Sequence, residues 1–480
     1  MNNLKKKTVK GVSWSVIDNI ANSGITFLVG VILARILSPE EFGLLGMIAI
    51  FIAMSNSIIE SGFSSALIRK VGAKPVDYNT VFYFNIFLGI ILYIILFFCA
   101  PSISNFFDEP LLVSITRVMG FILIINAFGI VQRTLLVKEV DFKMLTKISF
   151  IASILSGFVG VGMALRGFGV WSLVGQQMSR QLFNSIFLWV FNTWRPAMEF
   201  SKQSFDELFG FGSKLLISGL IDTIYKNIYY LVIGKLYSSS LLGQYTRADQ
   251  FNSIFSSNLT SVVQRVSYPV LCSIQDDEEK LRQVYRRVIK TTMLITFSCM
   301  LGMAAVAKPL ILLLIGEKWL PSVVFLQIIC FSGMLYPLHA INLNMLEVKG
   351  RSDLFLKLEI MKKIIGIFPI ILGIFCGIEF MLLGGVLMSF LAYFLNSYYS
   401  AELISYSTWQ QIKDILPSFL VSLFVATIMW SISYLGFSVW ITLPLQCFIG
   451  VILAVIIYEF MKLPEYLELK EIVLSTIKRK

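Results

Sequence analysis

The sequence predicts an all-α, polytopic membrane protein, and three observations carry this prediction. Of the 480 residues, 56% are hydrophobic and only 14% are charged, whereas about a quarter of a soluble domain is charged. The mean hydropathy is +0.78. The apolar residues gather into about fourteen segments close to the roughly 20 residues that a helix needs to cross a bilayer. The connections between them are too short to hold a soluble domain.

The segments follow one another along the whole chain. Lysines precede the first one, as in a signal peptide, but Asp18 and Asn22 interrupt its apolar run, so we expect a retained first helix. The fourteen segments occupy about residues 12–34, 42–66, 80–100, 111–136, 148–165, 169–191, 212–234, 242–270, 289–314, 322–346, 356–378, 380–404, 415–435 and 439–461.

Lysine and arginine predict the orientation, because they are enriched in cytoplasmic connections. With the amino terminus inside, about 30 of the 40 basic residues fall in inner stretches and about five in outer loops. Both termini are therefore expected in the cytoplasm. The remaining basic residues fall inside proposed helices: Arg117, Arg180, Lys226, Arg247 and Arg265.

The composition also bounds the partners and the chemistry. A net charge of +11 could indicate nucleic acid, but no basic run is longer than Lys5 to Lys7, so no nucleic-acid partner is expected. Six scattered cysteines and one histidine predict no disulfide, no metal site and no cofactor. The acidic run from Asp276 to Glu279 is interpreted as a solvated loop.

A weak internal repeat predicts how the segments are grouped. At an offset of 200 residues, Ser38 aligns with Ser238 and Gly43 with Gly243. A duplication of six helices would give two lobes with the same orientation, that is, parallel repeats. We therefore expect an N-terminal lobe over residues 1–206, a C-terminal lobe over 207–405, and two added helices with a cytoplasmic tail over 406–480.

Helical spacing places polar residues on shared faces. Asp18 and Asn22 are four residues apart in the first segment, as Asp222 and Lys226 are in the seventh. Glu60 lies near the inner third of the second segment. A charge at the centre of a membrane helix costs roughly 2.5 to 3.5 kcal/mol on insertion scales. These residues therefore indicate a hydrated cavity with a function.

Two further stripes strengthen this interpretation. The sixth segment aligns Gln176, Arg180 and Asn184, and the eighth carries Arg265 on one stripe with Arg247 nearer the outer end. Basic residues slightly outnumber the acidic ones in the proposed helices, so the cavity would suit an anionic cargo such as a phosphate-bearing lipid. A purely structural ion pair between Asp222 and Lys226 is the alternative. Snorkelling to the membrane surface is the alternative for Arg117 and Arg247.

The tenth segment contains the two remaining unusual residues. Pro337 removes a backbone hydrogen bond and permits a break in the helix. His339 is the lone histidine of the chain, and we expect it to have a structural role.

Several stretches together resemble Wzx-type lipid-linked oligosaccharide flippases of the polysaccharide transporter family. The similarity is strongest to the colanic-acid-exporter-like branch of the multidrug/oligosaccharidyl-lipid/polysaccharide exporter superfamily. The matching stretches run in order to about residue 360. They are GVSWS from Gly11, LARILSPEEFGLLGM from Leu33, SGFSSALI from Ser61, GFGVWSLVGQQ from Gly167, IGKLYSSSLLGQYTRADQF from Ile233, YPVLCSIQDDEEKLRQVYRR from Tyr268, GEKW from Gly316 and KGRSDLFLKL from Lys349.

The resemblance implies fourteen helices in two six-helix lobes around a central cavity. It also implies a non-enzymatic flippase that moves undecaprenyl-pyrophosphate-linked glycans across the bacterial inner membrane by alternating access. Membrane lipids, and a polysaccharide polymerase or assembly machinery, are the other partners to expect. The spacing argument alone nominates the residues: Arg180, Lys226, Arg247, Arg265, Gln176 and Asn184 for cargo, and Asp18, Glu60 and Asp222 for ion coupling.

Three alternatives remain open at this stage. A drug/cation antiporter of the same superfamily would normally have twelve helices and an acid-rich cavity. A peptidoglycan-precursor flippase would differ in cargo. A membrane glycan polymerase or ligase would be an enzyme, but such enzymes usually have a sizeable outer loop, and the longest outer loop here is about a dozen residues.

Overall fold

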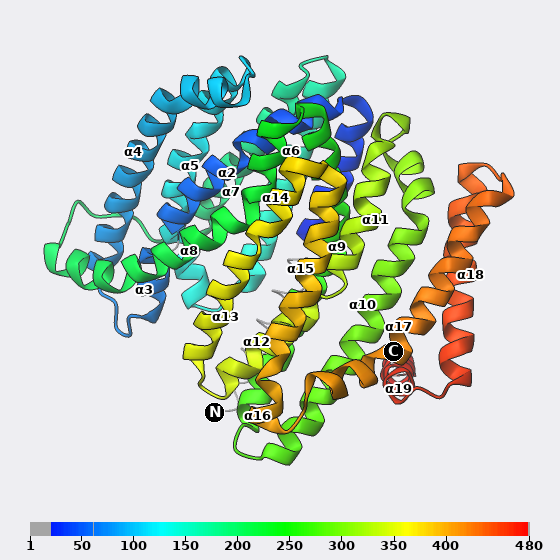
Figure 1. The fold of residues 1–480 in the computed structure, drawn as a ribbon. Coiled ribbons are helices and arrows are strands. Elements are labelled where there is room, and N and C mark those ends of the chain that lie inside the picture. Colours follow the sequence, from blue (N-terminus) through cyan, green and yellow to red (C-terminus); the bar gives the residue numbers. More distant parts are fainter. Residues whose placement is uncertain (1–20, 61, 479–480) are drawn as a thin grey trace. The chain divides into compact units, whose positions relative to one another are not determined.

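A computed structural model describes residues 21–60 and 62–478, and every regular element within them is a helix. Contacts divide the chain into two compact units, residues 1–246 and 247–480. Figure 1 shows the helices in chain order by colour. The predicted all-α membrane fold is confirmed. The predicted lobe boundaries stay predictions, because compactness alone does not define lobes within a membrane.

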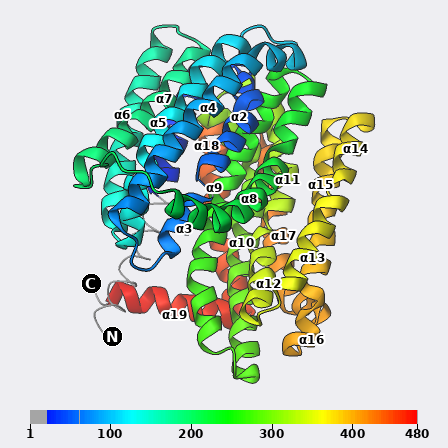
Figure 2. The ribbon, with the colours of Figure 1, turned by 90° about the vertical axis from the view of Figure 1, so that its left-hand side faces the viewer.

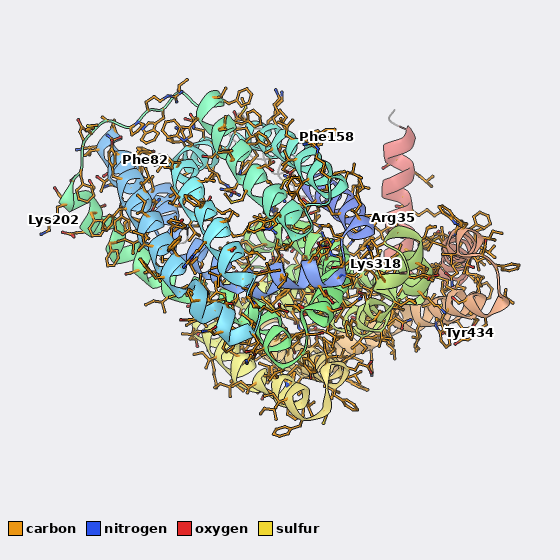
Figure 3. All side chains as sticks on the ribbon, turned by 90° about the horizontal axis from the view of Figure 1, so that it is seen from above. Arg35, Phe82, Phe158, Lys202, Lys318 and Tyr434 are labelled. Atoms are coloured by element: carbon orange, nitrogen blue, oxygen red, sulfur yellow. The ribbon has the colours of Figure 1, made fainter. Side chains whose placement is uncertain are left out.

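The first unit is a bundle in which α5 packs on both α4 and α7, and α6 packs on α7 (Figure 2). Helix α2 packs on α5 and α8. Buried aromatic residues, with Phe82 (Figure 3) among them, fill its core. Its helices are Ala21–Ile36, α2 (Pro39–Glu60), α3 (Phe63–Arg69), α4 (Pro75–Phe107), α5 (Leu112–Lys138), α6 (Phe142–Leu165), α7 (Val170–Phe191) and α8 (Lys202–Leu236), followed by the start of α9 (Ser239–Ser273).

The second unit centres on the long helix α10, which packs on α11, α17 and α18. Helix α15 packs on α14, α11 and α12. After the rest of α9 the elements are α10 (Glu278–Leu314), η1 (Glu317–Trp319), α11 (Pro321–Gly333), α12 (Tyr336–Val348), α13 (Ser352–Ile365), α14 (Ile367–Cys376), α15 (Ile378–Tyr398), α16 (Ser400–Ile404), α17 (Thr408–Ser431), η2 (Ile432–Leu435), α18 (Val439–Phe460) and α19 (Pro464–Lys478).

The expected fourteen spans are consistent with these helices. Within the described residues, nine helices are long and apolar enough to cross a membrane by themselves. The helix Ala21–Ile36 is apolar but shorter. Helices α7, α8 and α9 have 22, 35 and 35 residues and carry the polar groups singled out above. The remaining expected span, 356–378, is divided between α13 and α14.

The break predicted at Pro337 is present. The segment expected as one helix over 322–346 consists of α11 and α12, which meet at Met334 and Leu335. Pro337 lies in the first turn of α12, where its missing N–H removes no helical hydrogen bond. The proline therefore starts a new helix.

The tail after the last span contains a helix that the sequence reasoning missed. Helix α19 lies across the long axis of α10 (Figure 2). The buried carboxylate of Glu465 pairs with Lys290 of α10 at 3.0 Å, and Glu468 pairs with Arg287 at 2.6 Å. Removing Lys290 would leave the buried Glu465 carboxylate uncompensated, whereas the exposed pair of Arg287 with Glu468 contributes little. The tail is therefore fastened to α10 mainly through Glu465.

An ion-pair network joins the turn between α3 and α4 to α8. The Lys70 ammonium lies 2.8 Å from Glu207 and 3.1 Å from Asp77. The hydrogen bond to Glu207, the largest influence, outweighs the desolvation and raises the pKa of Lys70 above its ordinary value. Charged Lys70 therefore holds the start of α8 to this turn.

Ser38 and Ser238, which are aligned in the sequence repeat, both cap the start of a helix. The Ser38 N–H donates to the Glu41 carboxylate at 2.6 Å, and the Glu41 N–H donates to Ser38 Oγ at 3.4 Å. This reciprocal capping box starts α2. Ser238 Oγ accepts from the Leu241 N–H at 3.2 Å at the start of α9. Ser38 and Ser238 therefore cap the helices of equivalent hairpins.

The aligned glycines make a reciprocal contact between these two helix starts. A Cβ atom added to Gly43 would lie 1.7 Å from the carbonyl oxygen of Ser239, and one added to Gly243 would lie 1.8 Å from that of Pro39. Pro39 and Ser239 are themselves 200 residues apart. The contact thus has the two-fold character expected of duplicated hairpins, and only glycine lets the backbones approach this closely.

We predict that Gly43→Ala or Gly243→Ala lowers the melting temperature of the purified protein. The added methyl group forces the two backbones apart, and such overpacking typically costs about 1 to 3 kcal/mol. The control is Gly162→Ala in α6, where an added Cβ would meet no heavy atom within 4 Å. Alanine favours helix over glycine by roughly 0.5 to 1 kcal/mol, so this control should melt at an unchanged or higher temperature. If Gly43→Ala and Gly162→Ala have the same melting temperature, the prediction is contradicted.

Candidate functional site

A cluster of polar side chains lies inside the first unit, between three helices expected to cross the membrane. The amide nitrogen of Asn126 on α5 donates to Asn56 Oδ1 at 2.9 Å and to Glu60 Oε1 at 2.8 Å, both on α2. Asn126 Oδ1 accepts from the Gln181 amide of α7 at 2.8 Å. One carboxylate and three amides are therefore connected through Asn126, and we call them the Asn126 cluster.

Asn126 acts as both a hydrogen-bond donor and an acceptor in the Asn126 cluster. The Asn126 amide nitrogen donates to Glu60 and also to Asn56, so it connects both side chains of α2 to α5. In a medium of low dielectric constant, hydrogen bonds in such a chain strengthen one another, and a polar group left unpaired is costly. The Glu60 carboxylate is solvent-accessible in the isolated protein, so it can exchange a proton or meet a polar ligand.

The stripe predicted on α7 lies beside this cluster. Gln176, Arg180 and Asn184 are all partly buried. A Cβ atom added to Gly160 of α6 would lie 2.7 Å from the Gln176 Cβ, so α6 approaches α7 closely at this point. Arg180 precedes Gln181 in α7, so it lies on the helix that contributes Gln181 to the Asn126 cluster.

The predicted pair on α8 has different exposures. Asp222 is partly buried, whereas Lys226 is exposed. About one turn further on, the ring centroids of Tyr229 and Tyr230 lie 6.4 and 5.6 Å from that of Tyr245. Tyrosine combines an apolar ring with a polar hydroxyl. An accessible ammonium and an aromatic patch thus occupy neighbouring turns of this helix.

The other predicted residues fall elsewhere. Arg247 and Arg265 lie on α9 in the second unit and are partly buried. Asp18 lies outside the described residues. Arg117 donates to the Phe97 carbonyl at 3.4 Å, and its guanidinium lies 4.3 Å from the centroid of the Phe97 ring. Arg117 therefore has a local cation–π partner on α4, and whether it snorkels stays a prediction.

The second unit has a polar core of its own, which is buried. Asn342 of α12 is 1% exposed, and its Oδ1 accepts from the Tyr285 hydroxyl at 2.8 Å and from the Gln411 amide at 3.3 Å. His339 Nε2 lies 3.0 Å from Ser389 Oγ. Buried polar groups with partners fix the packing of helices, so the structure gives His339 the surroundings of a structural histidine.

Sequence reasoning singled out Glu60 and placed Gln181 beside the stripe of the sixth segment, but it missed Asn56 and Asn126. The search was directed at charges, and α5 carries an amide rather than a charge at its centre. Asn126 lies in the apolar run ILIINAFGI, and a single polar residue in such a run is the signal that could have indicated it. Within the part of the chain that the structure describes, no group of three or more His, Cys, Asp or Glu side chains could hold a metal ion.

Comparisons with known proteins identify relatives of the whole chain. The lipopolysaccharide biosynthesis protein WzxC of Escherichia coli (strain K12) is 25% identical over 376 residues, which cover 77% of this chain and 76% of WzxC. The succinoglycan biosynthesis transport protein ExoT of Rhizobium meliloti (strain 1021) is 28% identical over 333 residues, which cover 69% of this chain and 67% of ExoT. The expected resemblance to Wzx-type proteins is confirmed.

A solved structure shows the same fold. The lipid II flippase MurJ in its inward closed conformation matches with a TM-score of 0.73, covering 96% of this chain and 100% of that chain at 14% identity. The family model described as "Polysaccharide biosynthesis protein" matches residues 32–324. Because this match spans more than half of the chain, the protein belongs to the polysaccharide biosynthesis protein family.

Proposed function

We propose that this protein is a flippase that moves undecaprenyl-pyrophosphate-linked oligosaccharides from the inner to the outer leaflet of the bacterial cytoplasmic membrane. The cargo would serve the synthesis of a capsule, O-antigen or exopolysaccharide. One observation carries the proposal: a member of the polysaccharide biosynthesis protein family places charged and amide side chains inside helices expected to cross the membrane. Its activity would be transport without a chemical reaction.

The cost of moving a sugar through hydrocarbon explains why the helices carry these groups. Each unpaired hydroxyl transferred from water to an apolar medium costs about 1 to 3 kcal/mol even on protein-based scales. A polar path for the sugar head, with the polyprenyl tail left in the lipid, removes most of that cost. Rocking of repeats about a fixed site would open the path to each side in turn.

Each predicted residue receives a role in this proposal. Arg180 and Lys226, together with Arg247 and Arg265, would bind the pyrophosphate or acidic sugars, because guanidinium and ammonium groups match phosphate oxygens. Gln176 and Asn184 would donate and accept hydrogen bonds with sugar hydroxyls.

Ion coupling would involve the acidic residues. Glu60 is the best supported candidate, because its carboxylate accepts from Asn126, which connects α2, α5 and α7. A change in the charge of Glu60 on ion binding would alter its hydrogen bond with Asn126 and so the contact between α2 and α5. Asp18 and Asp222 are the other candidates.

The added helices favour this function over a drug/cation antiporter. Helices α17 and α18 are both long and apolar enough to cross a membrane, as expected of a fourteen-helix member. We further propose that both termini lie in the cytoplasm, in keeping with the distribution of lysine and arginine. A polymerase or assembly complex would receive the flipped cargo.

We predict that Arg180→Ala and Lys226→Ala each reduce glycan export in a strain that lacks its own flippase. Loss of one charge-assisted hydrogen bond, about 1.5 to 3 kcal/mol, corresponds to a roughly ten- to hundredfold weaker interaction with the cargo. Surface polysaccharide is measured alongside protein abundance in the membrane. The matched control is Arg117→Ala, whose guanidinium stacks on Phe97 and should be dispensable for export. Full export by both Arg180→Ala and Lys226→Ala at normal abundance would remove these residues from the mechanism.

The asymmetry between the repeats gives a narrower prediction. In the first segment Asn22 follows an acid by four residues, as Lys226 does in the seventh, although the two pairs are shifted by four residues in the register of the repeat. Lys226→Asn should impair export because it removes the charge and keeps a polar group. Unimpaired export with normal abundance would place the anionic group of the cargo elsewhere.

We also predict a rescue within the Asn126 cluster. Asn126→Asp places a second carboxylate about 3 Å from Glu60, where like charges repel and the donor is lost. Export and melting temperature should both fall. Adding Glu60→Gln restores a donor and acceptor pair and should recover the melting temperature. If it recovers the melting temperature while export stays low, the Glu60 carboxylate is needed for transport itself. If Asn126→Asp and the double variant Asn126→Asp/Glu60→Gln have the same melting temperature, the two side chains are not coupled.

A further inference from the structure

A concave groove lies on the surface of the first unit, between α5 and α7. It has a volume of about 610 Å³ and an almost wholly apolar lining. Ile125 and Phe128 form one wall, and Leu182, Ile186 and Val190 form the other. On α7 these residues follow the spacing of a single helix face. Leu182, Ile186 and Val190 are 43%, 44% and 65% exposed, so the groove is open along its length.

Close packing behind the groove fixes its shape. A Cβ atom added to Gly129 of α5 would lie 3.4 Å from Leu188 and 3.5 Å from the Ser185 hydroxyl of α7. The Trp189 indole N–H donates to the Phe128 carbonyl across the two helices at 3.0 Å. The buried ring of Phe82 (Figure 3) lies 6.1 Å from Phe128 and 5.8 Å from Trp189 between centroids. The groove is therefore preformed.

One end of the groove carries a fixed positive charge. The guanidinium of Arg195 donates to the carbonyls of Asn192 and Trp194 at 2.7 and 2.8 Å and to that of Trp189 at 3.0 Å. It also lies 5.4 Å from the centroid of the Trp189 ring. These contacts use three of the five N–H donors of an arginine, and the residue is exposed. Its other donors can meet a phosphate in a fixed orientation.

The opposite end of the groove meets polar residues. Gln181 lies four residues before Ser185, on the same face of α7, and belongs to the Asn126 cluster. Gln181 and Val190 are nine residues apart on α7, which is roughly 14 Å at a rise of 1.5 Å per residue, about half of a hydrocarbon core roughly 30 Å thick. The apolar groove is therefore one leaflet long, and the predicted orientation places it in the inner leaflet.

We infer that this groove is a docking site for the polyprenyl pyrophosphate carrier before it is flipped. The first isoprene units of the tail lie along the apolar walls, and the pyrophosphate contacts Arg195 at the inner surface. A single undivided groove accommodates one chain, whereas the second chain of a phospholipid would remain outside it. This inference rests on the proposed function, because the carrier is the lipid that such a flippase must capture from the inner leaflet.

Photocrosslinking in nanodiscs tests the inference directly. The full-length protein carries p-benzoylphenylalanine at Leu182 in the groove or, as a matched control, at Phe158. Phe158 is an apolar side chain of α6 that is 73% exposed (Figure 3). The nanodiscs contain phosphatidylglycerol and, as the probe, undecaprenyl pyrophosphate. We expect the ratio of polyprenyl to phospholipid adducts to be roughly tenfold higher at Leu182 than at Phe158, equivalent to about 1.4 kcal/mol.

Two further variants identify the parts of the site. Ile186→Trp fills the groove and should lower the adduct ratio at Leu182 to that at Phe158, whereas Leu155→Trp on α6 should leave it unchanged. Arg195→Gln should remove the preference for undecaprenyl pyrophosphate over uncharged undecaprenol. Equal adduct ratios at Leu182 and Phe158 in the otherwise unaltered protein would overturn the inference and assign the groove to ordinary bilayer lipid.

Failure of the groove inference can be distinguished from failure of the proposed function. If the unaltered protein restores glycan export in a flippase-deficient strain but shows equal adduct ratios, the groove inference alone fails. If it does not restore export, the proposed function fails, and the adduct ratio still decides whether the groove selects a polyprenyl chain.

Discussion

The reciprocal glycine contact between the starts of α2 and α9 is the constraint on which the rest of the first unit depends. Gly43 lies against the Ser239 carbonyl and Gly243 against that of Pro39, so two backbones touch with no side chain between them. This contact sets where α2 begins, and α2 carries Asn56 and Glu60 to Asn126. By the predicted orientation it lies at the outer end of the helices, where an alternating-access transporter must close and open. A contact without interlocking side chains suits that task, because it can separate without repacking a core.

Polar residues and the apolar groove follow one another along α7. Helix α7 carries Arg180 and Gln181 near its middle, then the apolar groove, and Arg195 follows its end. An amphipathic cargo needs such a division, because its sugars and phosphates must avoid hydrocarbon while its tail gains by remaining there. Under the proposed function, this arrangement gives a physical order to capture and transfer: the carrier would dock along the groove, and its head would then meet the polar groups of the helices.

The sequence allowed prediction of features that depend on local chemistry or on repetition. The apolar segments and the break at Pro337 follow from residues and their immediate neighbours. The equivalence of Ser38 with Ser238 follows from the repeat at an offset of 200 residues. The Asn126 cluster could not be predicted in the same way, because Asn126 and Glu60 are 66 residues apart and meet only through helix packing. Helix α19 was missed because its ion pairs with Lys290 and Arg287 come from α10, and the α5–α7 groove is visible only once both helices are in place.

The most direct test of the central claim is transport by the purified protein alone. Proteoliposomes are prepared with an undecaprenyl-pyrophosphate-linked oligosaccharide, and a glycosidase added outside measures how much glycan becomes accessible with time. The account predicts that the protected fraction decreases in proteoliposomes and stays constant in liposomes without protein. The same protected fraction in both, with the protein shown to be folded and inserted, would contradict the assignment as a flippase.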